Sequence, residues 1–179
     1  MTVNKNILDI GCGLNKKPGA IGIDSSINVN PDVLHNLNKF PYPFEDNTFD
    51  LIYCDNVLNE LDYFFKTMEE IYRITKPGGT VKVINPYFRS RYAFIHPNIK
   101  SFFNINTFNY FDPDHIIFNK YKYSQAKFKT TKMIFNENVT HNRYSRIISF
   151  FANKYPVNYE IYLSNIFPLD SLTWYLKKV

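Results

Sequence analysis

Two short apolar runs, one followed by glycines and the other by an acid, constrain the fold of this chain more than any other feature. The first run, Ile7-Leu8-Asp9-Ile10, breaks into Gly11-Cys12-Gly13, and the second, Ile21-Gly22-Ile23, ends on Asp24. The first run is too short for an ordinary helix and is typical of a buried parallel strand. The glycines permit backbone angles closed to other residues and let a ligand lie against bare peptide. Because an acid at the end of the next strand can accept hydrogen bonds from a ribose diol, the two runs predict a nucleotide-binding edge of a parallel sheet.

The connection between these two runs is unusually short. Only residues 14–20 follow the glycines, and they include Pro18-Gly19. A crossover that contains a helix takes at least about ten to twelve residues, so we expect a loop here and little help from a helix N-terminus in binding a ligand. The next gap, residues 25–32, is equally short. The first half of the sheet is therefore expected to lack helices on at least one face, which the C-terminal segments or a second copy in a homodimer would cover.

The remaining pattern predicts an α/β fold with a mainly parallel sheet. We expect strands over residues 6–10, 21–24, 33–37, 49–54 and 80–84, with a helix over residues 57–75. That helix has an apolar stripe and is expected to stop at Lys76-Pro77-Gly78-Gly79. Beyond Asn85 the pattern loosens, and it predicts helices over 99–111, 142–154 and 170–178 and strands over 125–135 and 159–166.

No internal repeat or linker divides the 179 residues. The expected organisation is a single domain over residues 1–179, large enough to bury about 70% of its unfolded surface. The chain has no apolar leader after a basic start and no apolar run that could span a bilayer, so a cytoplasmic protein without a membrane span is expected. Cys12 and Cys54 do not make a disulfide framework and are expected to be small packing residues, with no metal site.

Charge is distributed unevenly along the chain. Residues 1–80 carry 7 Lys and Arg against 11 Asp and Glu, whereas residues 81–179 carry 14 against 5. This asymmetry predicts that the C-terminal half meets something anionic. A small-molecule or glycan-like anion is favoured over nucleic acid as this binding partner. The chain is crowded with Asn, Ile, Lys, Phe and Tyr, as an AT-rich genome would dictate, and that bias alone accounts for the interleaved Lys and aromatic residues of Tyr121–Phe128.

Four stretches together resemble the class I S-adenosylmethionine-dependent methyltransferases, in particular small members with a shortened first crossover. They are Ile7–Gly13, Ile21–Asp24, Phe44–Tyr53 and Tyr72–Thr80, in the family's order and spacing. The resemblance implies a Rossmann-like, mainly parallel seven-stranded sheet with a C-terminal antiparallel strand and few helices in the first half. It also implies S-adenosylmethionine as cofactor. Residues 1–85 would form the cofactor half, and residues 86–179 would bind the acceptor and complete the sheet.

Residue by residue, the resemblance implies the following cofactor contacts. The methionine part would pass the turn at Gly11, Cys12 and Gly13, with Asp9 supporting that turn from beneath. The remaining contacts would be the ribose with Asp24, the adenine with Asn36 and Leu37, and the methionine moiety and methyl group with Cys54 and Asp55. Relatives often carry an acid at the position of Asn36, where the amide could still bond the adenine amino group.

The chemistry of methyl transfer sets modest demands on a protein. The sulfonium already activates the methyl group, so the enzyme must align a nucleophile and exclude water, and a general base is needed only for a proton that is not lost unaided. The carboxyl edge of the sheet supplies Asp55, Tyr87 and His96 as catalytic candidates. Arg89 and Arg91 are candidates for binding an anionic acceptor, with Tyr92 beside them. Relatives carry an Asp-Pro-x-His-like pattern where this chain has His96-Pro97-Asn98-Ile99, so an inherited catalytic histidine is in doubt.

Two alternatives stay open from the sequence. The first is a non-catalytic subunit with a methyltransferase fold that binds the cofactor or a partner, because Asn59-Glu60 stands where relatives often show Glu-His. The second is another dinucleotide-binding enzyme. The absence of a third glycine and of a full first helix argues against NAD.

Overall fold

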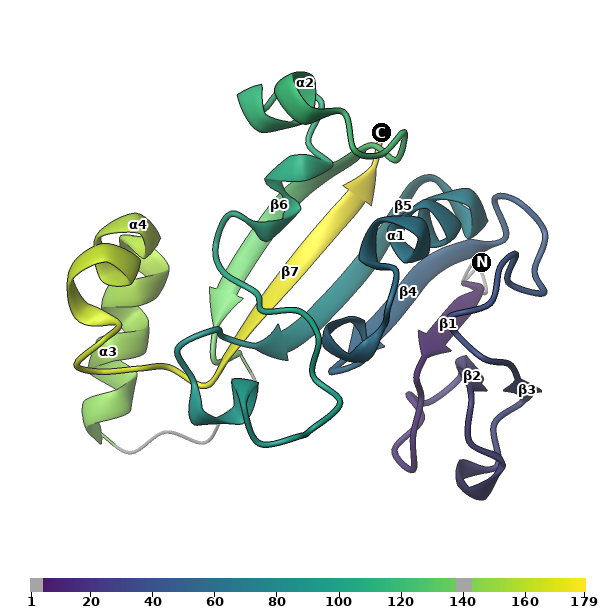
Figure 1. Cartoon of the computed structure of the whole chain (residues 1–179), viewed down its shortest axis with the longest axis horizontal. Coiled ribbons are helices and arrows are strands. Elements are labelled where there is room, and N and C mark those ends of the chain that lie inside the picture. The colour runs from purple at the N-terminus through teal and green to yellow at the C-terminus, as the bar shows by residue number, and fades with distance from the viewer. Residues whose placement is uncertain (1–4, 138–142) are drawn as a thin grey trace.

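A computed structural model describes residues 5–137 and 143–179 of the chain. The strands are β1 (Ile7–Ile10), β2 (Ile21–Asp24), β3 (Val33–Leu34), β4 (Phe49–Asp55), β5 (Thr75–Pro86), β6 (Phe128–Phe135) and β7 (Ser171–Lys178). The helices are α1 (Phe64–Ile74), α2 (Ile116–Tyr121), α3 (Arg143–Lys154) and α4 (Pro156–Asn158), joined by the short helical turns η1 (Ile27–Val29), η2 (Leu58–Glu60), η3 (Arg91–Ala93), η4 (Thr107–Tyr110) and η5 (Tyr159–Leu163). Figure 1 shows α1 against the middle of the sheet and α3 and α4 beyond its β6 edge.

All seven strands form one sheet in the order β3-β2-β1-β4-β5-β7-β6. The pairs from β3 to β5 are parallel, and β7 runs antiparallel to both β5 and β6. The expected Rossmann-like sheet with an antiparallel C-terminal strand is confirmed. Strand order reverses between β1 and β4, and the carboxyl ends of these two strands are where open sheets of this kind bind ligands.

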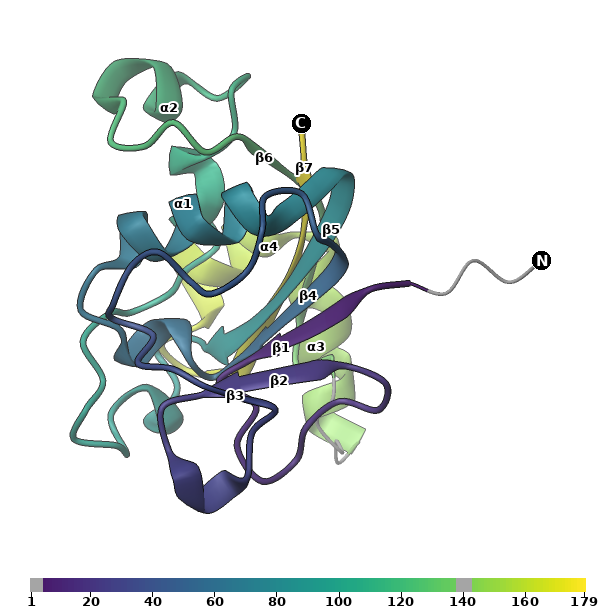
Figure 2. The ribbon, with the colours of Figure 1, turned by 90° about the vertical axis from the view of Figure 1, so that its right-hand side faces the viewer.

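The connection from β1 to β2 is a loop, as its length predicts. Residues 11–20 contain no helix, and the Gly11 amide donates to the Ile23 carbonyl at 2.8 Å, which ties the turn to β2. The third strand is shorter than the expected 33–37, because only Val33 and Leu34 pair with β2. The first three strands therefore meet at one edge with their connecting loops stacked around it (Figure 2).

The helix expected over residues 57–75 begins later than the pattern suggests. Residues 58–60 form the turn η2, and α1 begins at Phe64, because the Asp62 amide donates to Asn38 Oδ1 at 2.8 Å instead of continuing a helix. The stretch Pro77-Gly78-Gly79 was expected to end this helix. It is a bulge inside β5, where the pairing register jumps from Phe49–Thr75 to Leu51–Thr80.

Two C-terminal expectations are wrong. Residues 170–178 were expected to form a helix, but they form β7, because Leu172, Trp174 and Leu176 alternate with period two and are all fully buried. Residues 159–166 were expected to form a strand, but the chain there is helical through η5. The fully buried Tyr159 explains this, since its hydroxyl donates to the Phe167 carbonyl and accepts from the Leu169 amide, which folds the segment back on itself.

The helix expected over residues 99–111 is also wrong, since only η4 forms there. Asn104 Oδ1 accepts from the Asn106 amide and Thr107 Oγ1 from the Asn104 amide, so side chains take the backbone groups that a helix would use. The strand expected over residues 125–135 is present as β6, and the helix expected over 142–154 is present as α3. Its first expected residue, Asn142, lies outside the described residues.

Aromatic side chains fill the core between α1 and the C-terminal strands. Phe64 and Phe103 meet edge to face at 5.6 Å between ring centroids, and Phe108 meets Trp174 at 5.1 Å. Lys178 ends β7 inside this structure with only 8% of its surface exposed. Its Nζ donates to Asn47 Oδ1 and to two carbonyls near the end of α1, so the last strand is fastened to the first half of the chain.

The two faces of the central strands are covered unequally. Ile52 and Cys54 of β4 are fully buried in the core, whereas Leu51 and Tyr53 on the opposite face are only partly buried. The expectation that one face of the first half carries little cover therefore agrees with the side-chain exposure. Within residues 5–137 and 143–179, none of the helices combines the length and apolarity that crossing a membrane requires.

Candidate cofactor and acceptor site

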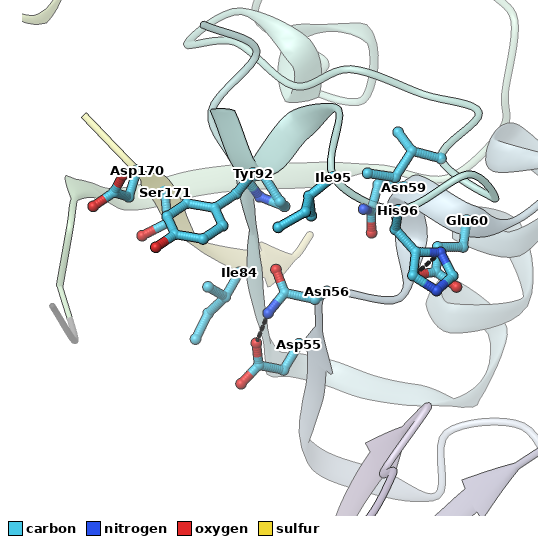
Figure 3. A pocket seen from close by; sticks show the side chains of 12 residues that line it. Asp55, Asn56, Asn59, Glu60, Ile84, Tyr92, Ile95, His96, Asp170 and Ser171 are labelled. Carbon is cyan, nitrogen blue, oxygen red and sulfur yellow. Dashed lines mark hydrogen bonds and ion pairs between the residues drawn. The ribbon is translucent and has the colours of Figure 1, made fainter. Parts of the chain in front are cut away.

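Three adjoining hollows lie along the carboxyl edge of β1, β2, β4 and β5. One of about 400 Å³ is lined by Gly11, Asp24, Asn36 and Leu37 among others, and one of about 250 Å³ by Asp9, Gly11–Gly13, Lys17 and Asp55. A third of about 470 Å³ lies beyond β4 and β5, and Figure 3 shows the side chains that line it. Asn56 lines all three, so the hollows adjoin one another at this residue, and together they are called the crevice.

The glycine turn and the acid after β2 are directly joined. Gly11 and Gly13 have φ values of 66° and 51°, and a Cβ on Gly11 would lie 2.5 Å from Val57 Cγ2. The Gly13 amide donates to Asp24 Oδ2 at 3.0 Å, and the Ser26 amide donates to Asp24 Oδ1 at 2.9 Å. Each carboxylate oxygen keeps a second lone pair, so Asp24 can still accept from hydroxyl groups of a ligand.

Asp9 lies beneath the turn, as the sequence leads us to expect. Its carboxylate is 2% exposed and accepts from the Lys17 amide at 2.8 Å, which holds the far end of the loop. Burial raises the pKa of the Asp9 carboxyl, although the Lys17 amide opposes this. The Lys17 side chain then reaches into the 250 Å³ hollow and pairs with Asp55 Oδ2 at 3.0 Å. A cation is thus present where the carboxylate of an amino-acid ligand could lie.

Both cysteines are buried and free. Burial raises the pKa of the Cys12 and Cys54 thiols, so neither is poised as a thiolate. Cys12 still lines the 250 Å³ hollow, whereas Cys54 is fully buried behind the sheet edge. Among the described residues no group of three or more His, Cys, Asp or Glu side chains could hold a metal ion.

Asn36 and Leu37 both line the 400 Å³ hollow with Asp24. The Asn36 side chain also has a local role, because its Oδ1 accepts from the Asn38 amide at 2.9 Å. Leu37 is 5% exposed, and its carbonyl accepts from the buried Tyr42 hydroxyl at 2.9 Å. The loop after β3 is therefore fixed in place from below.

The end of β4 forms the junction between the hollows. Asp55 Oδ1 accepts from Asn56 Nδ2 at 2.8 Å, while its other oxygen pairs with Lys17. Asn56 has a φ of 53°, a left-handed conformation that Asn tolerates better than most residues, and its amide donates to the Ile84 carbonyl. This geometry places Asp55 between the 250 Å³ hollow and the 470 Å³ cavity, whose linings both include it.

His96 and Tyr92 line the 470 Å³ cavity on the side of the loop after β5. His96 Nδ1 lies 3.6 Å from Glu60 Oε1, and about half of the His96 side chain is exposed (Figure 3). The Tyr92 hydroxyl accepts from Arg91 at 2.8 Å. The structure thus brings Asp55, His96 and Tyr92 to one cavity.

Three other candidates are not brought there. Tyr87 is fully buried, its hydroxyl donates to Glu160 Oε2 at 3.2 Å, and burial raises its pKa. Arg89 stacks on the Phe88 ring at 4.9 Å, and Arg91 stacks on Tyr92 outside the cavity lining.

The polar residues of the crevice that sequence reasoning missed include Lys17, Asn56, Asn59, Glu60 and Asp170. Asn56 could have been found, because it directly follows a predicted strand whose end was already assigned to the site. Asp170 could not, because its place depends on β7, which was misread as a helix. Lys17 stood in a loop that offered no pattern pointing its side chain toward Asp55.

Comparison with known proteins agrees with this geometry. Residues 8–83 match the family model described as a methyltransferase domain, and the fold is that of the class I methyltransferases. The resemblance inferred from the four sequence stretches is therefore confirmed, and the matched residues contain the glycine turn, Asp24 and Asp55 of the crevice.

Two curated relatives match part of the domain. An uncharacterized protein of Methanocaldococcus jannaschii is 36% identical over 95 residues, which cover 44% of this chain and 39% of that protein. A ubiquinone/menaquinone biosynthesis C-methyltransferase of Hydrogenovibrio crunogenus is 33% identical over 104 residues, which cover 54% of this chain and 37% of that enzyme. These matches span well under half of the length of either relative.

Solved structures share the methyltransferase fold across nearly the whole chain. An S-adenosylmethionine-dependent methyltransferase from Archaeoglobus fulgidus has a TM-score of 0.59 at 18% identity, covering 97% of this chain and 86% of that one. The [4+2]-cyclase SpnF has a TM-score of 0.58 at 17% identity, covering 97% of this chain and 74% of that one. At these identities the likeness shows the fold alone, and the cyclase illustrates that one fold serves more than one reaction.

Proposed function

We propose that this domain binds S-adenosylmethionine in the two smaller hollows and transfers its methyl group to an acceptor in the 470 Å³ cavity. The observation that carries the proposal is the bond from the Gly13 amide to Asp24, which joins the bare glycine turn to the acid expected to bind a ribose. S-adenosylmethionine supplies a methyl group already activated by its sulfonium. The donor set of the crevice fits such a ligand, with a carboxylate for hydroxyls at one end and an ammonium for a carboxylate at the other.

Each residue of the crevice then has a distinct part. Asp24 accepts from the ribose hydroxyls, while Asn36 and Leu37 bound the adenine. Lys17 binds the carboxylate of the methionine moiety as that moiety passes Gly11–Gly13, and Asp9 holds the turn through the Lys17 amide. Cys54 supports the end of β4 from behind and does not touch the ligand.

The acceptor side supplies alignment and, where needed, a base. Asp55 stands between the cofactor hollow and the cavity, so it orients the acceptor next to the methyl group. His96 receives a proton from an acceptor that must lose one, and its half-exposed ring can return that proton to water. Tyr92 forms one wall.

An anionic acceptor, expected from the charge of the C-terminal half, gains no support from this cavity. Its lining contains no Lys or Arg side chain. Arg89 and Arg91 as anion-binding residues remain predictions, and both lie outside that lining.

Calorimetry with S-adenosylhomocysteine tests the cofactor site directly. Asp24→Ala should weaken binding about 10- to 100-fold, because it removes an acceptor that bonds through a charged group. Asp32→Ala is the matched control, since Asp32 also accepts a backbone amide, from Gly22 at 2.6 Å, but lines none of the three hollows. Equal affinities of wild type and Asp24→Ala for S-adenosylhomocysteine, with both proteins folded, would contradict the proposed cofactor site.

The rival proposal is a non-catalytic subunit that retains the cofactor site. Asn59-Glu60, where relatives often show Glu-His, favours it. A tritiated-methyl transfer screen across RNA, protein and metabolite fractions separates the two. Tight binding of S-adenosylhomocysteine with no transfer in any fraction supports the subunit, and transfer into any fraction supports the enzyme.

The division of the chain and its assembly are also part of the proposal. Residues 1–85 hold the cofactor, residues 86–179 complete the sheet and bind the acceptor, and together they form one domain. The partly covered face at Leu51 and Tyr53 is where a homodimer would form. Light scattering at high concentration tests this, and a monomeric mass would remove the dimer.

A further inference from the structure

The helical segment from α3 to η5 presents many apolar side chains to solvent. Its helices pack on one another beyond the β6 edge of the sheet (Figure 1). The apolar side chains that are at least half exposed there include Tyr144, Ile147, Phe150, Ile161, Tyr162 and Phe167. Single exposed apolar residues are normal on a protein, but a gathering of them on packed elements marks a surface for a protein or membrane partner. We call this gathering the α3–η5 surface.

The helix α3 is apolar on two sides. Ile148 and Phe151 pack toward the core, so the helix has the inward apolar face that any surface helix needs. Ile147 and Phe150, three residues apart, share an outward side of the helix and are 62% and 70% exposed. A helix that is apolar all round is normally a covered one. The outward side of α3 therefore indicates contact with something less polar than water.

The exposed charges beside these apolar side chains are positive. Arg146 and Lys154 of α3 are both exposed. The one acid between residues 143 and 169 is Glu160, which is only partly exposed and whose Oε2 accepts from the buried Tyr87 hydroxyl. The α3–η5 surface is thus apolar and cationic, and its partner must be apolar and anionic.

We propose that the α3–η5 surface docks this domain on a lipid bilayer that contains anionic lipids. An amphipathic element of this kind lies in the interface and does not cross the membrane. Phe and Ile side chains would enter the acyl boundary, while the tyrosine rings would lie at the level of the headgroups with their hydroxyls toward water. The long stems of Arg146 and Lys154 let their charged ends reach lipid phosphates.

A second copy of the chain fits this surface less well than a bilayer does. A two-fold symmetric contact would repeat Arg146 and Lys154 on both sides. Among the described residues of the segment 143–169 there is no exposed acid to pair with them. Nucleic acid would match the cations, but it would leave the exposed isoleucines against a polar backbone. An anionic bilayer matches both features.

Docking also accounts for the uneven charge of the chain. Residues 81–179 carry 14 Lys and Arg against 5 Asp and Glu, yet no Lys or Arg of the described residues lines the 470 Å³ cavity. An anionic leaflet attracts such a positive half over about a Debye length. Phe167 precedes Asp170 of the cavity lining by three residues, so a docked domain would hold that cavity near the bilayer. The docking itself does not depend on methyl transfer.

Flotation of the full chain with vesicles tests the docking. One vesicle preparation is phosphatidylcholine alone, and the other contains phosphatidylglycerol as about a third of its lipid. We expect the ratio of bound to free protein to be at least about tenfold higher on the anionic vesicles and to fall as salt is added. Equal ratios on the two preparations, or no binding to either, would overturn the proposal.

Phe150→Ser separates docking from simple charge attraction. It removes an exposed ring and should lower the bound-to-free ratio on anionic vesicles about tenfold. Ile116→Ser is the matched control, because Ile116 is 76% exposed on α2, which stands apart from α3 (Figures 1 and 2), and it should bind as wild type does. Arg146→Gln combined with Lys154→Gln should remove most of the preference for anionic vesicles. A folded Phe150→Ser protein that floats like wild type would show that charge alone attracts the chain and would overturn the proposal.

A fluorescent reporter gives a second readout. Trp174 is the single Trp of the chain and is fully buried, so Phe150→Trp adds one reporter on the α3–η5 surface. Brominated phosphatidylcholine in the anionic vesicles should quench the Phe150→Trp emission strongly and the wild-type emission little. Equal quenching of the two proteins counts against docking. Light scattering without vesicles identifies the other occupant: a dimer that Phe150→Ser turns into a monomer, with no vesicle binding, would assign the surface to a second copy and overturn the proposal.

Discussion

In residues 5–85 the glycines and acids that stand out in the sequence line the crevice, whereas in residues 86–179 most of the residues that stand out serve other purposes. Gly11, Gly13 and Asp24 meet at the two smaller hollows. Tyr87 is buried in the core, and Arg89 lies outside the cavity. The difference arises because the first half lines the crevice largely with backbone and strand ends, whose positions follow from local pattern. The second half places its side chains by tertiary packing.

Removing a core aromatic of the second half should have the largest effect on stability. Trp174 is fully buried on β7 against Phe103 and Phe108, so Trp174→Ala should lower the free energy of unfolding by about 3–5 kcal/mol. Urea denaturation measures this. Trp174→Phe is the control and should lose less, because it keeps a ring and removes an indole N–H that has no partner among the described residues. A Trp174→Ala protein as stable as wild type would contradict the view that core packing determines the second half of the chain.

The next effect should come from the glycine turn. Gly11→Ala places a methyl group 2.5 Å from Val57 in a left-handed backbone, so we expect a loss of about 2–4 kcal/mol in unfolding free energy and weaker S-adenosylhomocysteine binding. Gly13→Ala is the matched control. Its backbone is also left-handed, but a Cβ there would meet nothing within 4 Å, so it should lose only about 1–2 kcal/mol. Equal losses would show that crowding by Val57 does not matter.

Tyr87→Phe sharpens the comparison with a smaller effect. The hydroxyl is buried and bonds to Glu160, so its loss should lower the unfolding free energy by about 1 kcal/mol. Methyl transfer should change by less than about twofold, because Tyr87 does not line the cavity. A fall in kcat of several orders of magnitude in a stable protein would instead return Tyr87 to the catalytic residues.

The smallest effect is a pH dependence that belongs to Asp9. Burial raises the pKa of the Asp9 carboxyl in the folded protein above its ordinary value, so over a range of pH the folded state holds a proton that the unfolded state has released. Stability from this group is therefore present at low pH and declines as the pH rises through the window between the two pKa values. The difference in unfolding free energy between wild type and Asp9→Asn should fall across that window. A flat or rising difference would show that the carboxyl is not desolvated.

Much of the first half could be predicted from sequence because short apolar runs and turn residues determine it locally. The order of β1, β2 and β4, the loop between the first two strands, and the placing of Asp24 beside the glycines all follow from such patterns. The errors concentrate after Asn85. Leu172, Trp174 and Leu176 alternate as a strand does, although the segment was predicted to be a helix, and Asp170 was lost from the site with it.

The inner position of Lys178 has a mechanical consequence. Its ammonium is bound to Asn47 and to the Tyr72 and Thr75 carbonyls, and burial lowers its pKa. These bonds fasten the end of β7 to the end of α1 and the start of β5, so the C-terminal half of the sheet is joined to the first half. Thermal melting should accordingly proceed as a single cooperative step, with the crevice dismantled only when the whole sheet comes apart.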